Sequence, residues 1–147
     1  MKVVVAAVRE DCPTALALRK EGVAFELVLM EHEYSYSDMF TRLWDKGYGD
    51  SFISLEHDII PWPGALQHLW QCRDYWCAHK YPLAPNAMQA ALGCIKVSRN
   101  LIFKYPLLCK LWNNREWNTL DGIVCPAIQA VAGKAHIHTP PFAHVKP

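Results

Sequence analysis

The sequence predicts a single α/β domain, residues 1–147, in which helices sandwich a mostly parallel central sheet. Strand-like apolar runs at 3–8, 25–30 and 51–55 alternate with helical segments in the first half of the chain. Strands separated by helices need crossover connections, and such connections favour parallel pairing. The length of 147 residues fits one domain, and a hydrophobic content of 52% supplies its core.

The first half of the chain carries the clearest element signals. Residues 3–8 form a continuous β-branched and alanine run, which is typical of a strand buried on both faces. Pro13 begins a short helix and Gly22 ends it. A second helix follows Ser37, whose hydroxyl can cap it, and this helix ends at Gly47.

The second half of the chain has a more mixed pattern. We expect a helix at 64–72, strands at 74–81 and 92–98 separated by a proline-containing stretch, and a helix at 121–132 that ends at Gly133. The segment 101–112 is ambiguous between helix and irregular structure, because Pro106 interrupts a helical pattern. The C-terminal tail begins as a strand and becomes extended at Pro140 and Pro141.

Charge and hydropathy exclude several classes of partner. Lys and Arg total 15 against 14 Asp and Glu, a formal net charge of +1, so nothing global favours a polyanion. A loose basic cluster is the one local exception: Lys96, Arg99, Lys104 and Lys110. No apolar run approaches the roughly 20 residues of a membrane span, and the apolar start is too short for a signal peptide. We therefore expect a cytoplasmic protein, which for a viral protein means the host cytoplasm.

The six cysteines give no metal-binding motif. No pair has CxxC spacing, and the closest pair, Cys72 and Cys77, matches no common zinc motif. Most of the six lie in apolar surroundings, where a free thiol packs as a small hydrophobic group. We expect structural packing rather than metal or redox chemistry from them.

An acidic pair follows the third apolar run, in the segment FISLEHDIIPWPGAL. Glu56 and Asp58 come just past the carboxyl end of the predicted strand, the edge at which parallel α/β sheets bind ligands. Residues two apart on a strand face the same side, so both carboxylates can approach one Mn²⁺ or Mg²⁺ ion. The alternative is a solvated strand end that carries two acids.

The order of these features resembles the inverting GT-A glycosyltransferases. These have a Rossmann-like nucleotide-binding fold, and the resemblance is to their family-2-like members, which include cellulose-synthase-like and rhamnosyl-type enzymes. The segments VVVAAVRE and FELVLMEHEYS resemble the first two strands of that family, FISLEHD its acidic signature, and LGCIKVS its glycine-led strand. The segment TLDGIVCPAIQAVAGKAHIHTPPFAHVK resembles its catalytic acid, helix, strand and closing histidine.

The resemblance implies a metal site. Asp58 would be the principal ligand of Mn²⁺ or Mg²⁺, and Glu56 would contact the metal or the ribose. His144 matches the closing histidine, and a neutral imidazole is a good ligand for Mn²⁺. His136 and His138 are rivals for that role, since they alternate on a strand and share a face. For any one histidine the alternative is a surface or packed imidazole.

The resemblance also implies a catalytic base and contacts to the donor. Asp121 would take the proton from the acceptor hydroxyl. Its alternative role is a plain helix N-cap. The residues implied for the nucleotide sugar are Glu31 at the base, Arg9 and Arg42 at the nucleotide or its phosphates, Gly93 under the donor sugar, and Trp62 stacked on a sugar. Solvated charges and a half-buried aromatic ring are the corresponding alternatives.

These observations predict a metal-dependent glycosyltransferase that uses a UDP- or GDP-sugar. Residues 1–60 would bind the nucleotide, and residues 61–147 would bind the acceptor and carry the catalytic base. The acceptor is a hydroxyl of a glycan, a protein or a modified DNA base. The alternative function is a non-catalytic nucleotide-sugar or metal-binding module. The chain is short for this class, so we expect a compact, viral-type form whose acceptor cleft a homodimer would complete.

Overall fold

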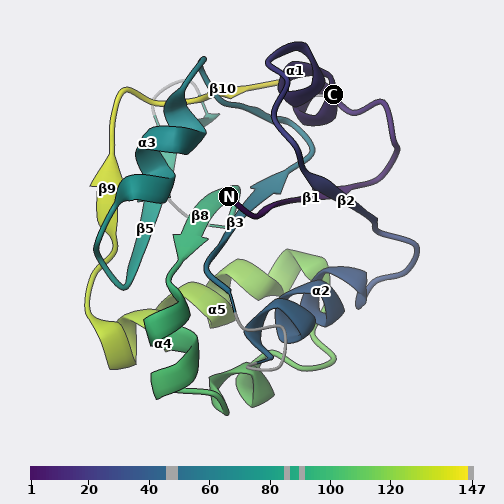
Figure 1. The fold of residues 1–147 in the computed structure, drawn as a ribbon. Helices are drawn as coiled ribbons and strands as arrows, with labels where there is room; N and C mark the ends of the chain where they lie inside the picture. The colour runs from purple at the N-terminus through teal and green to yellow at the C-terminus, as the bar shows by residue number, and fades with distance from the viewer. Residues whose placement is uncertain (46–49, 85–86, 90–91, 146–147) are drawn as a thin grey trace.

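A six-stranded sheet forms the middle layer of the molecule (Figure 1). The computed structural model describes residues 1–45, 50–84, 87–89 and 92–145. In spatial order the strands are β2 (Glu26–Leu29), β1 (Val3–Ala7), β3 (Phe52–Glu56), β8 (Cys94–Val97), β5 (Trp76–His79) and β9 (His136–His138). Strands from both predicted halves of the chain share this sheet. The assignment of nucleotide and acceptor roles to the two halves stays a prediction.

Parallel pairing dominates the sheet. Strand β1 pairs in parallel with β2 and β3, and β5 pairs in parallel with β9. Strand β8 runs antiparallel to both of its neighbours, β3 and β5. The predicted α/β class with a mostly parallel central sheet is therefore confirmed.

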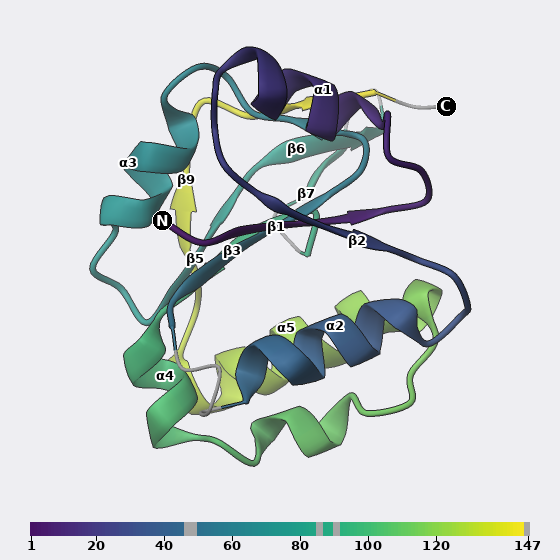
Figure 2. The ribbon, with the colours of Figure 1, turned by 45° about the vertical axis from the view of Figure 1, so that its right-hand side comes forward.

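Helices cover both faces of the sheet (Figure 2). On one side lie α1 (Pro13–Lys20) and α3 (Ala65–Gln71); on the other lie α2 (Ser35–Trp44), α4 (Arg99–Lys104), a 3₁₀ turn (Leu108–Leu111) and α5 (Trp117–Ala132). Within the described ranges, no helix is both long and apolar enough to cross a membrane.

The apolar run of β1 is continuous because both faces of this strand are buried. Val4 and Ala6 belong to the core cluster that contains α2 and α5. Val3, Val5 and Ala7 belong to the opposite cluster, which contains α1 and α3. All five residues are buried, so the predicted two-sided burial is confirmed.

Several predicted boundaries differ from the structure. Helix α2 begins at Ser35, so Ser37 lies inside it and donates from Oγ to the Tyr34 carbonyl at 3.0 Å instead of capping it. The predicted end of this helix, Gly47, lies outside the described residues. Helix α5 begins at Trp117, four residues earlier than expected, which makes the N-cap interpretation of Asp121 wrong.

Two short ladders complete the fold. Strand β4 (Ile59–Ile60) pairs antiparallel with β10 (Ala143–His144), and β6 (Tyr81–Ala84) pairs antiparallel with β7 (Ala87–Gln89). The β6–β7 ladder occupies the proline-containing stretch that the sequence placed between two strands. The β4–β10 ladder joins the C-terminal tail to the end of β3.

Candidate functional site

The candidate site begins where β3 ends. Glu56 is the last residue of β3, and a two-residue turn containing Asp58 leads into β4. The Thr14 hydroxyl, at the start of α1, holds this turn from the side: Oγ1 is 2.6 Å from the Glu56 carbonyl oxygen and 2.8 Å from that of Ile59. The carboxylates are thereby fixed at the carboxyl end of the parallel strands, as predicted.

The β4–β10 ladder brings a histidine to Asp58 from 86 residues away. His144 is paired with Ile59, and the amide of Val145 donates to the Asp58 carbonyl at 2.8 Å. The His144 Nε2 atom lies 2.9 Å from Asp58 Oδ2, and the two side chains are only 13% and 15% exposed. His144, rather than its rivals His136 and His138, is therefore the tail histidine that contacts Asp58.

The donor set at this pair fits a divalent metal ion. His144 Nδ1 lies 2.7 Å from the Pro82 carbonyl oxygen, which can only accept a hydrogen bond. The neutral tautomer that donates there directs its Nε2 lone pair at Asp58, and such a carbonyl partner is typical of metal-binding histidines. Asp58 Oδ1 is buried and has no hydrogen-bond partner among the described residues. A cation beside Asp58 could be bound by both Asp58 Oδ1 and His144 Nε2.

Glu56 is held in an environment that disfavours its charge. The pKa of Glu56 rises to about 7, mainly because the side chain is buried and also because the Asp121 and Asp58 carboxylates lie nearby. A hydrogen bond from Tyr36 and the nearby His144 act in the opposite direction. Such a carboxyl group exchanges its proton near neutral pH.

Asp121 approaches the same place from inside α5. Its Oδ1 accepts a 2.9 Å hydrogen bond from the Leu92 amide, and burial raises the pKa of its carboxyl group. The Glu56 amide donates to the Gly93 carbonyl at 3.0 Å. The Leu92–Gly93 turn, which precedes β8, thus lies between the two acids and contacts both.

Glycine is required at position 93 because the Tyr81 ring lies too close for a larger side chain. A Cβ atom at position 93 would lie 2.5 Å from Tyr81 Cζ, well inside van der Waals contact. The Gly93 amide also donates to the Tyr81 hydroxyl at 3.3 Å. The glycine-led strand that the sequence associated with the donor sugar is therefore packed tightly at its start.

We expect Gly93→Ala to destabilise the protein by about 1–3 kcal/mol, the usual cost of overpacking a filled core. The new methyl group must displace the ring of Tyr81. Urea unfolding measures the change. Gly122→Ala is a matched control in α5, because a Cβ there meets nothing within 4 Å and alanine favours helix by about 1 kcal/mol. Equal stability of Gly93→Ala and the native protein would contradict the packing argument.

The predicted nucleotide contacts divide between two cavities. Arg9 lines a cavity of about 300 Å³ together with His57, Asp58 and Val145. Glu31 and Arg42 line another cavity, of about 560 Å³, beside β2 and the start of α2. Arg9 is exposed and pairs with Asp11 at 3.2 Å, and Arg42 pairs with Glu26 at 2.6 Å. Arg9 is thus the predicted phosphate contact that shares a cavity with Asp58.

Trp62 contacts the C-terminal tail, and the loose basic cluster differs from its predicted arrangement. The Trp62 indole donates to the Pro140 carbonyl at 3.3 Å and packs edge-on against the His79 and Phe142 rings. Lys96 is buried, 4% exposed, and donates to the Cys72 carbonyl. The cluster with Arg99, Lys104 and Lys110 therefore loses one of its four cations, because β8 places Lys96 inside the sheet.

The structure adds three site residues that sequence reasoning missed: Thr14, Tyr36 and Tyr81. The Tyr36 hydroxyl is buried, forms a hydrogen bond with the Glu56 carboxylate and lies 3.4 Å from the Leu92 carbonyl oxygen. A tyrosine on the apolar face of a helix is a usable signal, because a buried hydroxyl needs a polar partner. Thr14 and Tyr81 carry no such signal in the sequence.

The sequence matches no known protein-family profile and no curated protein. Solved structures do resemble the fold. A glycosyltransferase involved in glycosylation of the major capsid of PBCV-1 superposes with a TM-score of 0.53 at 14% identity, over 97% of this chain and 92% of that one. A197 from STIV gives 0.50 at 13% identity, over 70% and 67% of the two chains.

A third similar structure is a sugar nucleotidyltransferase. A protein described as a glucose-1-phosphate thymidylyltransferase from Bacillus anthracis, solved with sucrose, gives a TM-score of 0.54 at 7% identity, over 97% of this chain and 88% of that one. At these identities the likeness is one of fold. The predicted GT-A-like, Rossmann-like α/β fold is confirmed.

Proposed function

We propose that this protein is a metal-dependent glycosyltransferase that moves a sugar from a nucleotide sugar to an acceptor hydroxyl. The observation that carries the proposal is the Asp58–His144 pair at the carboxyl end of β3, with Glu56 and Asp121 beside it. The fold adds support, because the solved structures that resemble it include a capsid glycosyltransferase and a sugar nucleotidyltransferase.

Asp58 and His144 would hold Mn²⁺ or Mg²⁺. Such ions are often bound by one or two protein ligands together with substrate phosphates, so this pair suffices, with Glu56 as an additional ligand or ribose contact. When bound, the ion neutralises the diphosphate leaving group. Arg9, which lines the same cavity as Asp58, would contact the phosphates.

Asp121 would act as the general base in a single displacement. The acceptor oxygen attacks the anomeric carbon and loses its proton to the Asp121 carboxylate, while the bond from that carbon to the diphosphate breaks. The sugar is transferred with inversion, and a nucleoside diphosphate leaves. A raised pKa suits Asp121 to this role, because a base is most effective when its pKa approaches the working pH.

The donor is a UDP- or GDP-sugar in this proposal, and the acceptor is a hydroxyl of a glycan or a protein. A hydroxylated base in DNA is the less favoured acceptor, because Lys96 is buried and the net charge is only +1. In the cavity beside β2, Glu31 is a proposed contact for the nucleotide base, and Arg42 for the nucleotide or its phosphates. Trp62 is a proposed contact for a sugar. A homodimer is the proposed assembly.

Metal-dependent donor binding is the first test. Calorimetry with Mn²⁺ should detect binding of UDP- or GDP-sugars that EDTA abolishes. His144→Ala should weaken this binding at least about 10–100-fold, the range already seen for loss of an outer-shell partner. His68→Ala is the matched control, because His68 is exposed on α3 and its ring contacts His138 instead of Asp58.

Two results would count against the proposal. Equal donor affinity with and without metal would remove Asp58 and His144 as metal ligands. Strong donor binding with no transfer to any acceptor and no hydrolysis would favour the alternative, a non-catalytic nucleotide-sugar-binding module.

A further inference from the structure

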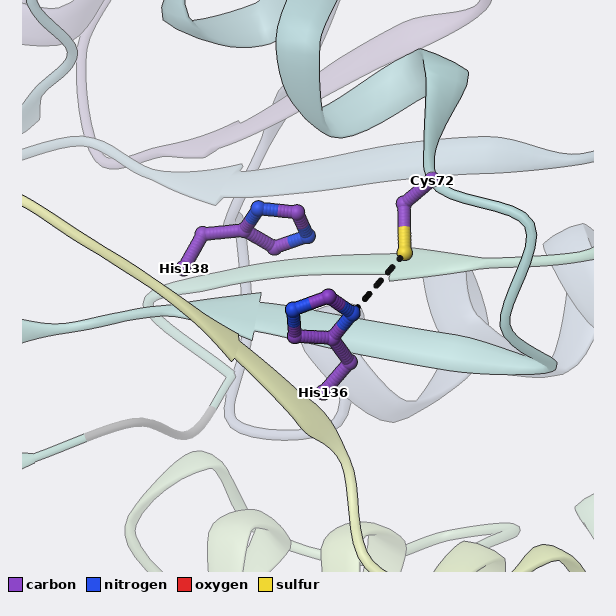
Figure 3. Close-up of side chains that lie close together, drawn as sticks. All are labelled: Cys72, His136 and His138. Carbon is purple, nitrogen blue, oxygen red and sulfur yellow. Dashed lines mark hydrogen bonds between the residues drawn. The ribbon is translucent and has the colours of Figure 1, made fainter.

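A second group of potential metal ligands lies apart from the Asp58–His144 pair (Figure 3). Cys72, His136 and His138 each offer one ligand atom, and these three atoms all lie within 4.8 Å of one another. Among the described residues this is the one trio of His, Cys, Asp or Glu side chains with that spacing. It lies between the end of α3 and strand β9.

The fold explains why these three side chains converge. His136 and His138 are two apart on β9 and therefore share a face, and their rings stack with centroids 4.5 Å apart. Cys72 directly follows the last residue of α3 and extends toward them, so that its Sγ lies 3.6 Å from His136 Nδ1 (Figure 3). None of the three belongs to the candidate site at β3.

The group has the features of a site rather than a packed cluster. His138 is only 6% exposed, and its Nε2 has no hydrogen-bond partner among the described residues. This ring extends toward Cys72 and His136 (Figure 3). All three side chains line a cavity of about 320 Å³. A buried nitrogen without a partner costs free energy, and a bound cation would remove that cost.

We propose that Cys72, His136 and His138 bind a zinc ion. One thiolate and two imidazoles form a borderline-soft donor set, which favours Zn²⁺ over Mn²⁺ or Mg²⁺. In a tetrahedral Zn²⁺ site, neighbouring ligand atoms lie about 3.3–3.8 Å apart, as bond lengths of about 2.0–2.3 Å require. Small side-chain rotations from the present spacing reach that geometry.

The charges around the group are suited to this ion. Asp74 Oδ2 lies 2.7 Å from His136 Nδ1 and 3.6 Å from Cys72 Sγ. Together with the Cys72 thiolate, this carboxylate balances the charge of Zn²⁺. Two cations lie nearby: the Lys96 ammonium group donates to the Cys72 carbonyl, and Arg73 lines the same cavity. Asp74 offsets one of these charges.

A zinc ion here would join α3 and β9, two elements that lie more than 60 residues apart in the sequence. Strand β9 is the last strand of the sheet and pairs only with β5 in the strand order. The ion would tie it to the end of α3, which packs over the same region of the sheet (Figure 1). The expected role is structural.

The test is a zinc titration of metal-free protein against a chromophoric chelator, followed by thermal unfolding. We expect one equivalent of Zn²⁺ and, at about a hundredfold excess over Kd, a rise in Tm of about 5–10 °C. Co²⁺ should give the thiolate charge-transfer band of a tetrahedral site. Cys72→Ser and His136→Ala should each abolish these effects; both side chains are partly exposed, so the fold should survive.

Two matched controls separate this site from others. Cys109→Ser removes another partly buried thiol and should leave zinc binding unchanged. Asp58→Asn removes a ligand of the proposed catalytic ion and should also leave it unchanged, so the zinc proposal stands or falls independently of the proposed function. Undiminished zinc affinity in Cys72→Ser, zinc binding lost in Asp58→Asn, or no zinc binding by the native protein would each overturn it.

Discussion

Asp121→Asn is expected to lower the rate of sugar transfer about 10²- to 10⁴-fold, the usual contribution of a general base. Affinity for Mn²⁺ and the donor should not change, because Asp121 is not among the proposed metal ligands. The amide has nearly the same shape as the carboxylate, and its oxygen can still accept the hydrogen bond from the Leu92 amide. The substitution therefore removes the proton acceptor, together with one of the charges that raise the pKa of Glu56.

The assay needs an acceptor, which a screen of labelled nucleotide sugars against glycans, proteins and hydroxymethylated DNA would supply. Slow hydrolysis of the donor is a second readout. Urea unfolding of Asp121→Asn checks that the Leu92 contact and the fold persist. If the variant transfers sugar at the native rate, Asp121 has no part in proton transfer and only holds the turn before β8.

Local patterns were sufficient to predict much of the fold. The run in β1 is continuous because alternate residues enter different cores, and that pattern needs no knowledge of the partner strands. The β4–β10 ladder could not be predicted in the same way. It joins two-residue strands that are more than 80 positions apart, and so short a segment has no periodicity of its own.

The acidic part of the candidate site was accessible from sequence because an apolar strand ends directly at Glu56. The resemblance added Asp121 and His144, which no local pattern connects to that strand. The proximity of Cys72 and His136 could not be predicted from the sequence. They are 64 residues apart, so no motif spacing relates them, and only the position of β9 beside α3 brings them together. The expectation that the cysteines serve only in packing did not foresee this.

Glu56→Gln is expected to raise the free energy of unfolding by about 2–3 kcal/mol at pH 8 without metal. The pKa of Glu56 is raised from 4.5 to about 7, and each unit of pKa corresponds to about 1.4 kcal/mol. Folded protein therefore holds this proton more tightly than unfolded protein does. By linkage, the stabilisation is complete below pH 4.5, falls as pH rises, and is lost above about pH 7.

The measurement is urea unfolding in EDTA at intervals from pH 5 to pH 8. The difference in stability between Glu56→Gln and the native protein should grow by up to about 1.4 kcal/mol per pH unit and level off above pH 7. Glutamine keeps an acceptor for Tyr36, so packing changes little. Glu10→Gln, at an exposed position, is the control, and its difference in stability from the native protein should not change with pH.

Adding Mn²⁺ should reduce the difference in stability between Glu56→Gln and the native protein at pH 8. A cation beside Asp58 stabilises the Glu56 carboxylate, whereas the neutral amide gains nothing from it. A flat profile for Glu56→Gln would mean that this carboxyl group is not buried among the acids around the Leu92–Gly93 turn.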